Sequence, residues 1–101
     1  MEYTRREKII NLLMQVREPL TVKAIGNLLG IPPREHYMLY EDLHHIAKTI
    51  RKRFKGKNLF MIPPQCSECG FVFKDMKRLR KPSRCPRCKS ERILPPRFII
   101  K

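Results

Sequence analysis

The chain has 101 residues, the size of one domain with at most a small appendage. Its 23 basic and 9 acidic side chains give a formal net charge of +14, which favours a polyanionic partner, most commonly nucleic acid in a cytosol. No apolar run approaches the roughly 20 residues that span a bilayer, so we expect no membrane partner. The first residues, MEYTRREK, lack the apolar segment of a secretory signal, so we expect a cytoplasmic protein.

Two amphipathic segments open the chain. The first begins at Thr4, which starts a Thr-x-x-Glu capping box, and its apolar spacing predicts a helix over about 4–17. The second helix is predicted over about 21–29. Thr21 suits its N-terminal cap, and Gly30 suits the left-handed position that commonly ends a helix.

A third helix is predicted over about 33–54, because Pro32-Pro33 suits a first helical turn and apolar residues follow at helical spacing. We expect the opposite face to be exposed to solvent; it carries Met38, Glu41, Asp42, His45 and Lys48-Thr49. Four aromatic side chains have a spacing that favours core packing over base stacking: Tyr37, Tyr40, Phe54 and Phe60. The short turn before this helix predicts a helix-turn-helix arrangement.

Two apolar segments, at about 58–62 and 97–100, are predicted to be strands. A proline pair follows the first and another precedes the second, and prolines mark where strand pairing stops. A hairpin of these strands after a helix-turn-helix is the wing of a winged helix. We therefore predict an α+β fold, in which residues 1–62 and 97–101 form a winged-helix domain and residues 63–96 are a zinc ribbon inserted at the wing.

Four cysteines in the inserted segment predict a metal site: Cys66, Cys69, Cys85 and Cys88. They form two Cys-x-x-Cys pairs separated by 15 residues, a spacing typical of zinc ribbons, and a reducing compartment disfavours disulfides. Two such turns complete a tetrahedron of thiolates around one structural zinc ion. Iron in a rubredoxin-type site uses the same ligands and stays open as the alternative, with electron transfer as its associated function.

The surroundings of the cysteines are predicted to differ between the two pairs. Gly70 lets the backbone turn toward the first pair of sulfurs, whereas Lys89-Ser90 follows the second pair, so we expect that turn to be less regular. Residues 71–73 alternate like a short strand, with Ile93 as its candidate partner.

The net charge is concentrated in the second half of the chain. Residues 1–47 carry six basic and six acidic side chains, so the whole +14 lies in residues 48–101. We expect the wing and ribbon to supply most phosphate contacts, and the third helix, which carries carboxylates, to read bases only to a limited extent. The candidate contact residues are Arg34, His36, Lys48, Arg51, Lys52, Arg53, Lys55, Lys57, Lys77, Arg78, Arg80 and Lys81.

No catalytic motif is present in the sequence. It has no glycine-rich phosphate loop, no nucleophile elbow and no Cys-His pair with a plausible role. The three histidines, His36, His44 and His45, have no paired carboxylate geometry and suit an exposed helix face. We therefore expect a protein that is not an enzyme.

The order of these motifs resembles a family of small, predicted archaeal transcriptional regulators that combine a helix-turn-helix with a zinc ribbon. The resemblance rests on TRREKIINLL, LYEDLHHIAK, QCSECGFVFK, PSRCPRCKSE and the closing PPRF, and it runs through nearly the whole chain. It implies a winged helix with a rubredoxin-like zinc ribbon inserted at the wing, and it implies DNA binding.

The leading hypothesis is a cytoplasmic, non-catalytic, DNA-binding transcription regulator. Two alternatives stay open: an adaptor whose ribbon docks on a protein of the transcription machinery, and an RNA- or ribosome-associated zinc protein. Many helix-turn-helix proteins bind DNA as dimers, so a homodimer is also compatible with the sequence. No heptad or additional helix identifies a surface for it.

Overall fold

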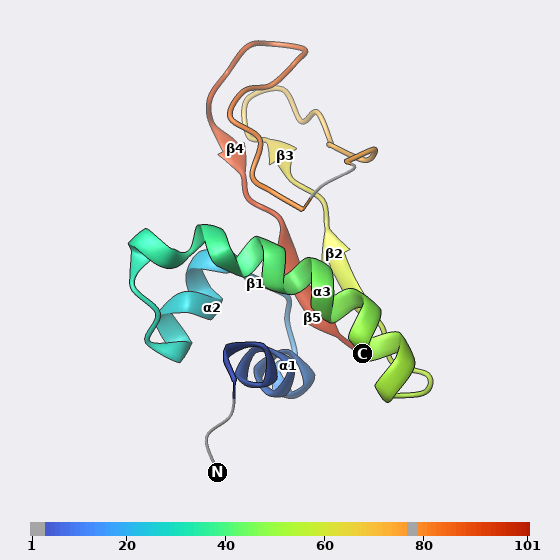
Figure 1. Cartoon of the computed structure of the whole chain (residues 1–101). Helices are drawn as coiled ribbons and strands as arrows, with labels where there is room; N and C mark the ends of the chain where they lie inside the picture. The colour runs from blue at the N-terminus through green and yellow to red at the C-terminus, as the bar shows by residue number, and fades with distance from the viewer. Residues whose placement is uncertain (1–3, 77–78) are drawn as a thin grey trace.

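The structure, a computed structural model, describes residues 4–76 and 79–101. Its helices are α1 (Arg5–Gln15), α2 (Val22–Leu29) and α3 (Tyr37–Arg53), with a short 3-10 helix at Pro33–Glu35. Its strands are β1 (Leu20–Thr21), β2 (Leu59–Ile62), β3 (Gln65–Cys66), β4 (Ile93–Leu94) and β5 (Arg97–Ile100). The fold is α+β, with the three helices packed around one end of the molecule and the cysteine-rich segment extending from the other (Figure 1).

The starts of α1 and α2 follow from their capping residues. The Thr4 hydroxyl accepts a hydrogen bond from the Glu7 amide at 3.2 Å, and the Thr21 hydroxyl accepts one from the Ala24 amide at 3.1 Å. Gly30 ends α2 with a φ of 71°, in the left-handed region that glycine adopts without strain. These caps are the ones that the sequence predicts.

The third helix begins later than the sequence predicts. Pro32 stays extended, with a ψ of 147°, because a residue before proline disfavours the helical region. Residues 33–35 therefore form a separate 3-10 turn, and α3 starts only at Tyr37. His36 lies at this junction, with its ring Nε2 2.9 Å from the Ile31 carbonyl oxygen.

Gly26 provides the space for His36. A Cβ atom at position 26 would lie only 2.2 Å from Nε2 of His36, so the imidazole packs where any side chain would stand. The turn between α2 and α3 is thus held by a side chain that the sequence assigns to nucleic-acid contact.

A three-stranded antiparallel sheet, in the order β1-β5-β2, covers the helices. Phe98 of β5 is fully buried and pairs with Leu20 on one side and Met61 on the other. Residues from all three helices share its core, including Ile9, Leu13, Ile25, Leu39, Leu43, Ile46 and Ile50. The sequence does not predict the two-residue strand β1, because two residues between helices carry no periodicity.

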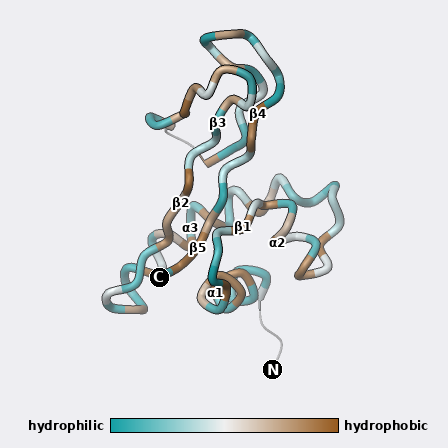
Figure 2. The backbone as a smooth tube through the Cα atoms, turned by 180° about the vertical axis from the view of Figure 1, so that it is seen from behind, coloured by the Kyte–Doolittle hydropathy of each residue, from teal (hydrophilic) through white to brown (hydrophobic). Residues whose placement is uncertain are grey.

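The cysteine-rich segment continues from the paired strands β2 and β5 and gives the molecule its long axis, with overall dimensions of 48 × 31 × 23 Å. Figure 2 shows hydrophobic residues along β2 and β5 and largely hydrophilic ones in the outer loops of this segment. Leu79 in one of these loops packs against the helical core, so the segment also contacts the helices away from the strands. Among the described residues, no helix combines the length and the apolar character needed to cross a membrane.

Three expectations about individual side chains are wrong. Asp42 is not on an exposed face but only 1% exposed. Tyr37 and Phe60 are not core residues, since they are 73% and 47% exposed. Ile93 pairs with Cys66, whereas Val72 forms an isolated bridge to Gln65.

Two arginines explain the burial of Asp42. Both the Nε and an Nη atom of Arg5 donate to its carboxylate, and the Nε of Arg6 donates to Oδ1 at 3.0 Å. Burial would raise the pKa of Asp42, but the hydrogen bonds and charges of the two arginines together lower it below its ordinary value. The Asp42 carboxylate therefore links α3 to the start of α1 through two ion pairs.

We expect Asp42→Asn to lower the free energy of unfolding by about 1.5–3 kcal/mol at neutral pH, because it removes charge-assisted hydrogen bonds from a buried group. Urea denaturation with zinc present measures the change. Because the pKa is lowered on folding, the carboxylate stabilises the fold above the unfolded-chain pKa, which is about 3.9. The difference in the free energy of unfolding between the wild type and Asp42→Asn should therefore decrease as the pH falls below about 4.

Glu41→Gln is the matched control, since Glu41 is the exposed neighbour on the same helix. It should change the stability by less than about 0.5 kcal/mol. Equal effects of the two substitutions would contradict a stabilising role for the buried carboxylate.

Candidate metal centre

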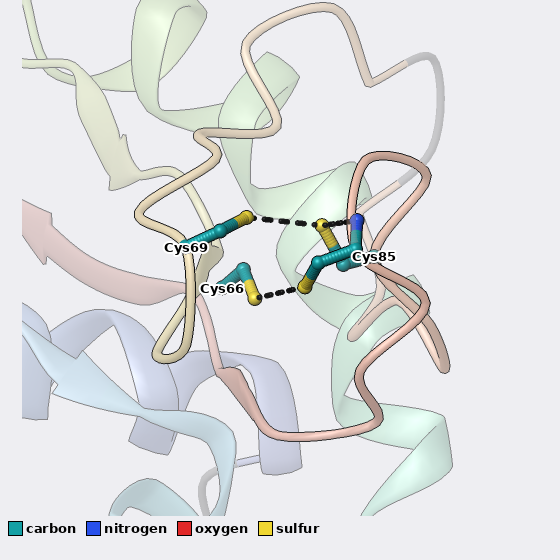
Figure 3. A group of neighbouring side chains, drawn as sticks. Cys66, Cys69 and Cys85 are labelled. Atoms are coloured by element: carbon teal, nitrogen blue, oxygen red, sulfur yellow. Dashed lines mark hydrogen bonds between the residues drawn. The ribbon is translucent and has the colours of Figure 1, made fainter.

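The sulfur atoms of Cys66, Cys69, Cys85 and Cys88 all lie within 4.8 Å of one another. Two of the separations are 3.5 Å, between Cys66 and Cys88 and between Cys69 and Cys85. Figure 3 shows the side chains of Cys66, Cys69 and Cys85 converging from two separate turns. Sulfur atoms around a tetrahedral zinc ion, at about 2.3 Å per bond, are about 3.8 Å apart, so the cluster fits such an ion.

The first cysteine turn follows strand β3. The Cys66 amide donates to the Phe71 carbonyl at 2.8 Å, and the Gly70 amide donates back to the Cys66 carbonyl at 3.0 Å. Gly70 has a φ of 81°, and this left-handed residue reverses the chain so that both sulfurs point inward.

The second turn repeats this geometry. The Cys85 amide donates to the Ser90 carbonyl at 2.8 Å, and the Lys89 amide donates to the Cys85 carbonyl at 2.9 Å. Lys89 has a φ of 65°, close to that of the glycine in the first turn. The expectation of a less regular second turn is therefore wrong: the lysine adopts the strained conformation that the site requires.

Backbone amides favour thiolates at two of the cysteines. Burial would raise the pKa of Cys85, but the amides of Cys88 and Arg87, 3.5 and 3.4 Å from its sulfur, lower the pKa to about 6. The amide of Cys69 is the main cause of a lowered pKa at Cys66.

The fourth thiol behaves in the opposite way. The amide of Ser90 would lower the pKa of Cys88, but burial and the three neighbouring cysteines raise it to about 12. Four thiolates cannot share this volume without a cation, because each added negative charge opposes the next. A divalent ion removes that repulsion, so binding it releases protons from the site.

Hydrophobic side chains surround the buried sulfurs. Ile93 packs against Cys66 and Cys85, and the rings of Phe71 and Phe73 meet edge to face, with their centroids 5.1 Å apart. Four thiolates complete a tetrahedron and leave no position for water, which is the arrangement of a structural rather than a catalytic ion. The segment is thus a zinc ribbon that holds one structural zinc ion.

The candidate nucleic-acid residues lie in two groups. Lys48, Arg51 and Lys52 are exposed on α3, followed by Lys55 and Lys57 in the turn after it. Arg80 and Lys81 are exposed on the ribbon loop, whereas Lys77 and Arg78 lie outside the described residues.

Three of the candidates, Arg51, Arg53 and His36, have other contacts; the Nε of Arg51 donates to the Ala47 carbonyl at 3.4 Å. Arg53 donates to the Glu7 carboxylate at 2.7 Å and lies over the Phe54 ring. His36 contacts the Ile31 carbonyl oxygen, as described above, and Arg34 is exposed in the 3-10 turn before it. The sequence has no signal for these contacts, because their partners are distant in the chain or belong to the backbone.

Removal of zinc should unfold the ribbon, approximately residues 66–92, while the three helices remain folded. The reason is that the ribbon's own apolar cluster is small, whereas the helices share a separate core. Far-ultraviolet circular dichroism and amide hydrogen exchange after chelation measure this. Elemental analysis of protein purified without chelator should give one zinc per chain; no bound metal would contradict the site, and one iron per chain would identify the other ion.

Lys89→Gly should raise the free energy of unfolding of the zinc-loaded protein by up to about 1 kcal/mol. Left-handed backbone costs a non-glycine residue about 1–2 kcal/mol, and the greater freedom of glycine in the unfolded chain offsets part of the gain. Gly70→Ala, the reverse change in the first turn, should lower the stability by about 1 kcal/mol, since the nearest atom to the new Cβ, on Gln65, is 3.9 Å away and only the backbone is strained. Urea denaturation measures the stability of both variants. A decrease in stability on Lys89→Gly would contradict backbone strain at Lys89.

Comparison with known proteins covers the whole chain. Residues 4–60 match the family model described as PF0610-like, N-terminal, and residues 63–101 match the PF0610 rubredoxin-like zinc beta-ribbon domain. The solution NMR structure of protein PF0610 from Pyrococcus furiosus is 35% identical and superimposes with a TM-score of 0.76, over 100% of this chain and 94% of that one. A comparison with curated proteins gives no match. Because the first model alone spans more than half of the chain, this protein belongs to the PF0610-like family.

Proposed function

We propose that this protein is a non-catalytic, DNA-binding transcription regulator of the cytoplasm, in which a winged helix and a basic zinc ribbon bind one duplex. In this proposal residues 1–62 and 97–101 are the winged helix and residues 63–96 extend its wing. The observation that carries the proposal is the exposed face of α3, whose second half carries basic side chains and no carboxylate.

The arrangement of elements supports a winged helix. A turn joins α2 to α3, and the pair β2 and β5 forms a hairpin that continues into the ribbon (Figure 1). A recognition helix of this type enters the major groove, while the hairpin lies along the adjacent backbone.

The burial of Asp42 changes the charge that α3 presents to a partner. With Asp42 bound to Arg5 and Arg6, the exposed face of the helix keeps one carboxylate, Glu41. The repulsion between this helix and phosphate is therefore weaker than two exposed carboxylates would give.

One stripe of α3 carries the positive charge. Lys48, Arg51 and Lys52 are exposed at helical spacing, and within the described residues none of them forms an ion pair. Lysines and arginines that have no carboxylate partner can neutralise phosphates and release the cations condensed on the DNA, which is a main source of affinity for DNA.

The ribbon offers a second basic surface, although part of its charge is compensated. Arg84 and Arg92 lie 3.9 and 3.3 Å from the carboxylates of Glu91 and Glu68. Arg80 and Lys81 have no such partner in the part of the chain that the structure describes.

A protein-interaction adaptor is the second candidate. It is favoured by the outer face of the hairpin, where Phe60 and Ile62 are exposed side by side on β2. An apolar surface of this kind is typical of protein contacts rather than of phosphate contacts.

Fluorescence anisotropy with labelled duplex DNA over a range of salt concentrations tests the proposal. The logarithm of the affinity should fall linearly with the logarithm of the salt concentration. The combined substitution of Lys48, Arg51 and Lys52 by alanine should reduce that slope by about 1 for each phosphate that the variant no longer neutralises.

The matched control removes the same charge elsewhere, by substituting alanine for Lys8, Arg17 and Lys23, which are exposed on or beside α1 and α2. It should leave the salt slope nearly unchanged. If duplex DNA does not bind at about 50 mM salt, or if both triple variants bind equally well, the proposed DNA surface is wrong. Tighter binding of structured RNA would support the RNA-associated alternative instead.

A further inference from the structure

A cleft of about 570 Å³ lies between the first half of α3 and the ribbon loop, which comes back toward that helix in Figure 1. Its walls are formed by Tyr37, Tyr40, Glu41, His44, Leu79 and Arg80. Four of these residues belong to α3, and the other two follow one another in the ribbon loop. The volume is in the range of sites for small organic groups.

The cleft is rich in aromatic side chains. Tyr37 is exposed at its rim, whereas Tyr40 is half-buried and packs against the helical core. His44 lies one turn further along the helix and adds a third flat ring. Leu79 closes the cleft from the ribbon side. Flat rings that are neither fully buried nor stacked on one another offer free faces to a planar ligand.

The charge around the cleft identifies the chemistry of that ligand. Arg80 lines the ribbon side, and Lys48 continues the exposed stripe of α3 one turn beyond His44. A planar group attached to phosphates would place its ring among the tyrosines and its negative charge near these cations. Aromatic faces beside a cationic track are the features with which proteins bind unpaired bases.

We propose that this cleft holds one unpaired base of a nucleic-acid strand whose phosphates contact the cationic stripe of α3. The inference rests on the proposed function and specifies its ligand: a nucleic acid with at least one unstacked base. Within a regular duplex both faces of each base are covered by its neighbours, so a fully paired duplex cannot fill the cleft. The carboxylate of Glu41 could accept a hydrogen bond from an exocyclic amine of such a base.

Fluorescence anisotropy compares a fully paired DNA duplex with the same duplex carrying one extra, unpaired base. The wild type should bind the second about tenfold more tightly, in line with the energy of one base–aromatic stacking contact. Tyr37→Ala should abolish this preference while keeping the affinity for the paired duplex. Tyr37→Phe, which retains the ring, should keep the preference.

Two controls make the comparison specific. Phe60→Ala truncates another exposed aromatic, on the outer face of the hairpin, and should leave the preference unchanged. The chain has three tyrosines and no tryptophan, so stacking on Tyr37 or Tyr40 should quench the intrinsic tyrosine emission upon titration with the unpaired-base duplex. DNA and RNA strands of the same sequence are compared to establish which sugar the ligand carries. A preference for an unpaired base in either of them supports base binding in the cleft.

The inference and the proposed function fail in different ways. Equal affinity for the two duplexes, or a preference that survives Tyr37→Ala, would overturn the base-binding cleft while duplex binding itself remains. Free nucleoside monophosphates that bind as tightly as the strand would also overturn it, since the cationic stripe would then contribute nothing. If the wild-type protein shows no salt-dependent binding to any of the nucleic acids, the proposed function is wrong.

Discussion

The antiparallel pairing of β2 with β5 is the constraint on which both parts of the molecule depend. The whole ribbon lies between the two strands in the sequence, so the chain enters the ribbon from β2 and returns from it through β5. On the helical side, Phe98 and Ile100 of β5 complete the core of the three helices. On the other side, the prolines that follow β2 and precede β5 end the pairing, and Pro64 and Pro96 are fully buried at this junction. The ribbon therefore continues directly from two paired strands through a junction that contains two buried prolines.

Much of the backbone follows from local sequence signals, because each signal acts within a few residues. The caps Thr4, Thr21 and Gly30 mark helix ends, and the two Cys-x-x-Cys pairs place the sulfurs of both turns. The predicted start of α3 is too early, because Pro33 is compatible with a first helical turn but equally with a 3-10 turn. The packing of the His36 ring against Gly26 joins α2 to the start of α3, and no signal within a few residues predicts it.

The side chains that sequence patterns misplace share a physical reason. Helical periodicity describes a helix that contacts one neighbour, but α3 contacts α1 on one flank and the ribbon loop on another. Asp42 is buried because two arginines of α1 reach it, and the periodicity of α3 contains nothing about those arginines. Tyr37 is exposed because α3 begins with it, beyond the reach of the core. The charge and the aromatic content of the proposed nucleic-acid surface thus become visible only when the elements are placed in space.

Leu79 gives the ribbon a second attachment to the helices, and this contact has a thermodynamic consequence. Leu79 lies between the two zinc turns in the sequence, so we expect its contact with the helices to depend on the ion. If a ligand in the cleft of α3 needs this loop in place, zinc and that ligand each bind more tightly when the other is present, and by the same factor. The four cysteines then do more than hold a small module together: they couple the metal content of the protein to the shape of a surface on its third helix.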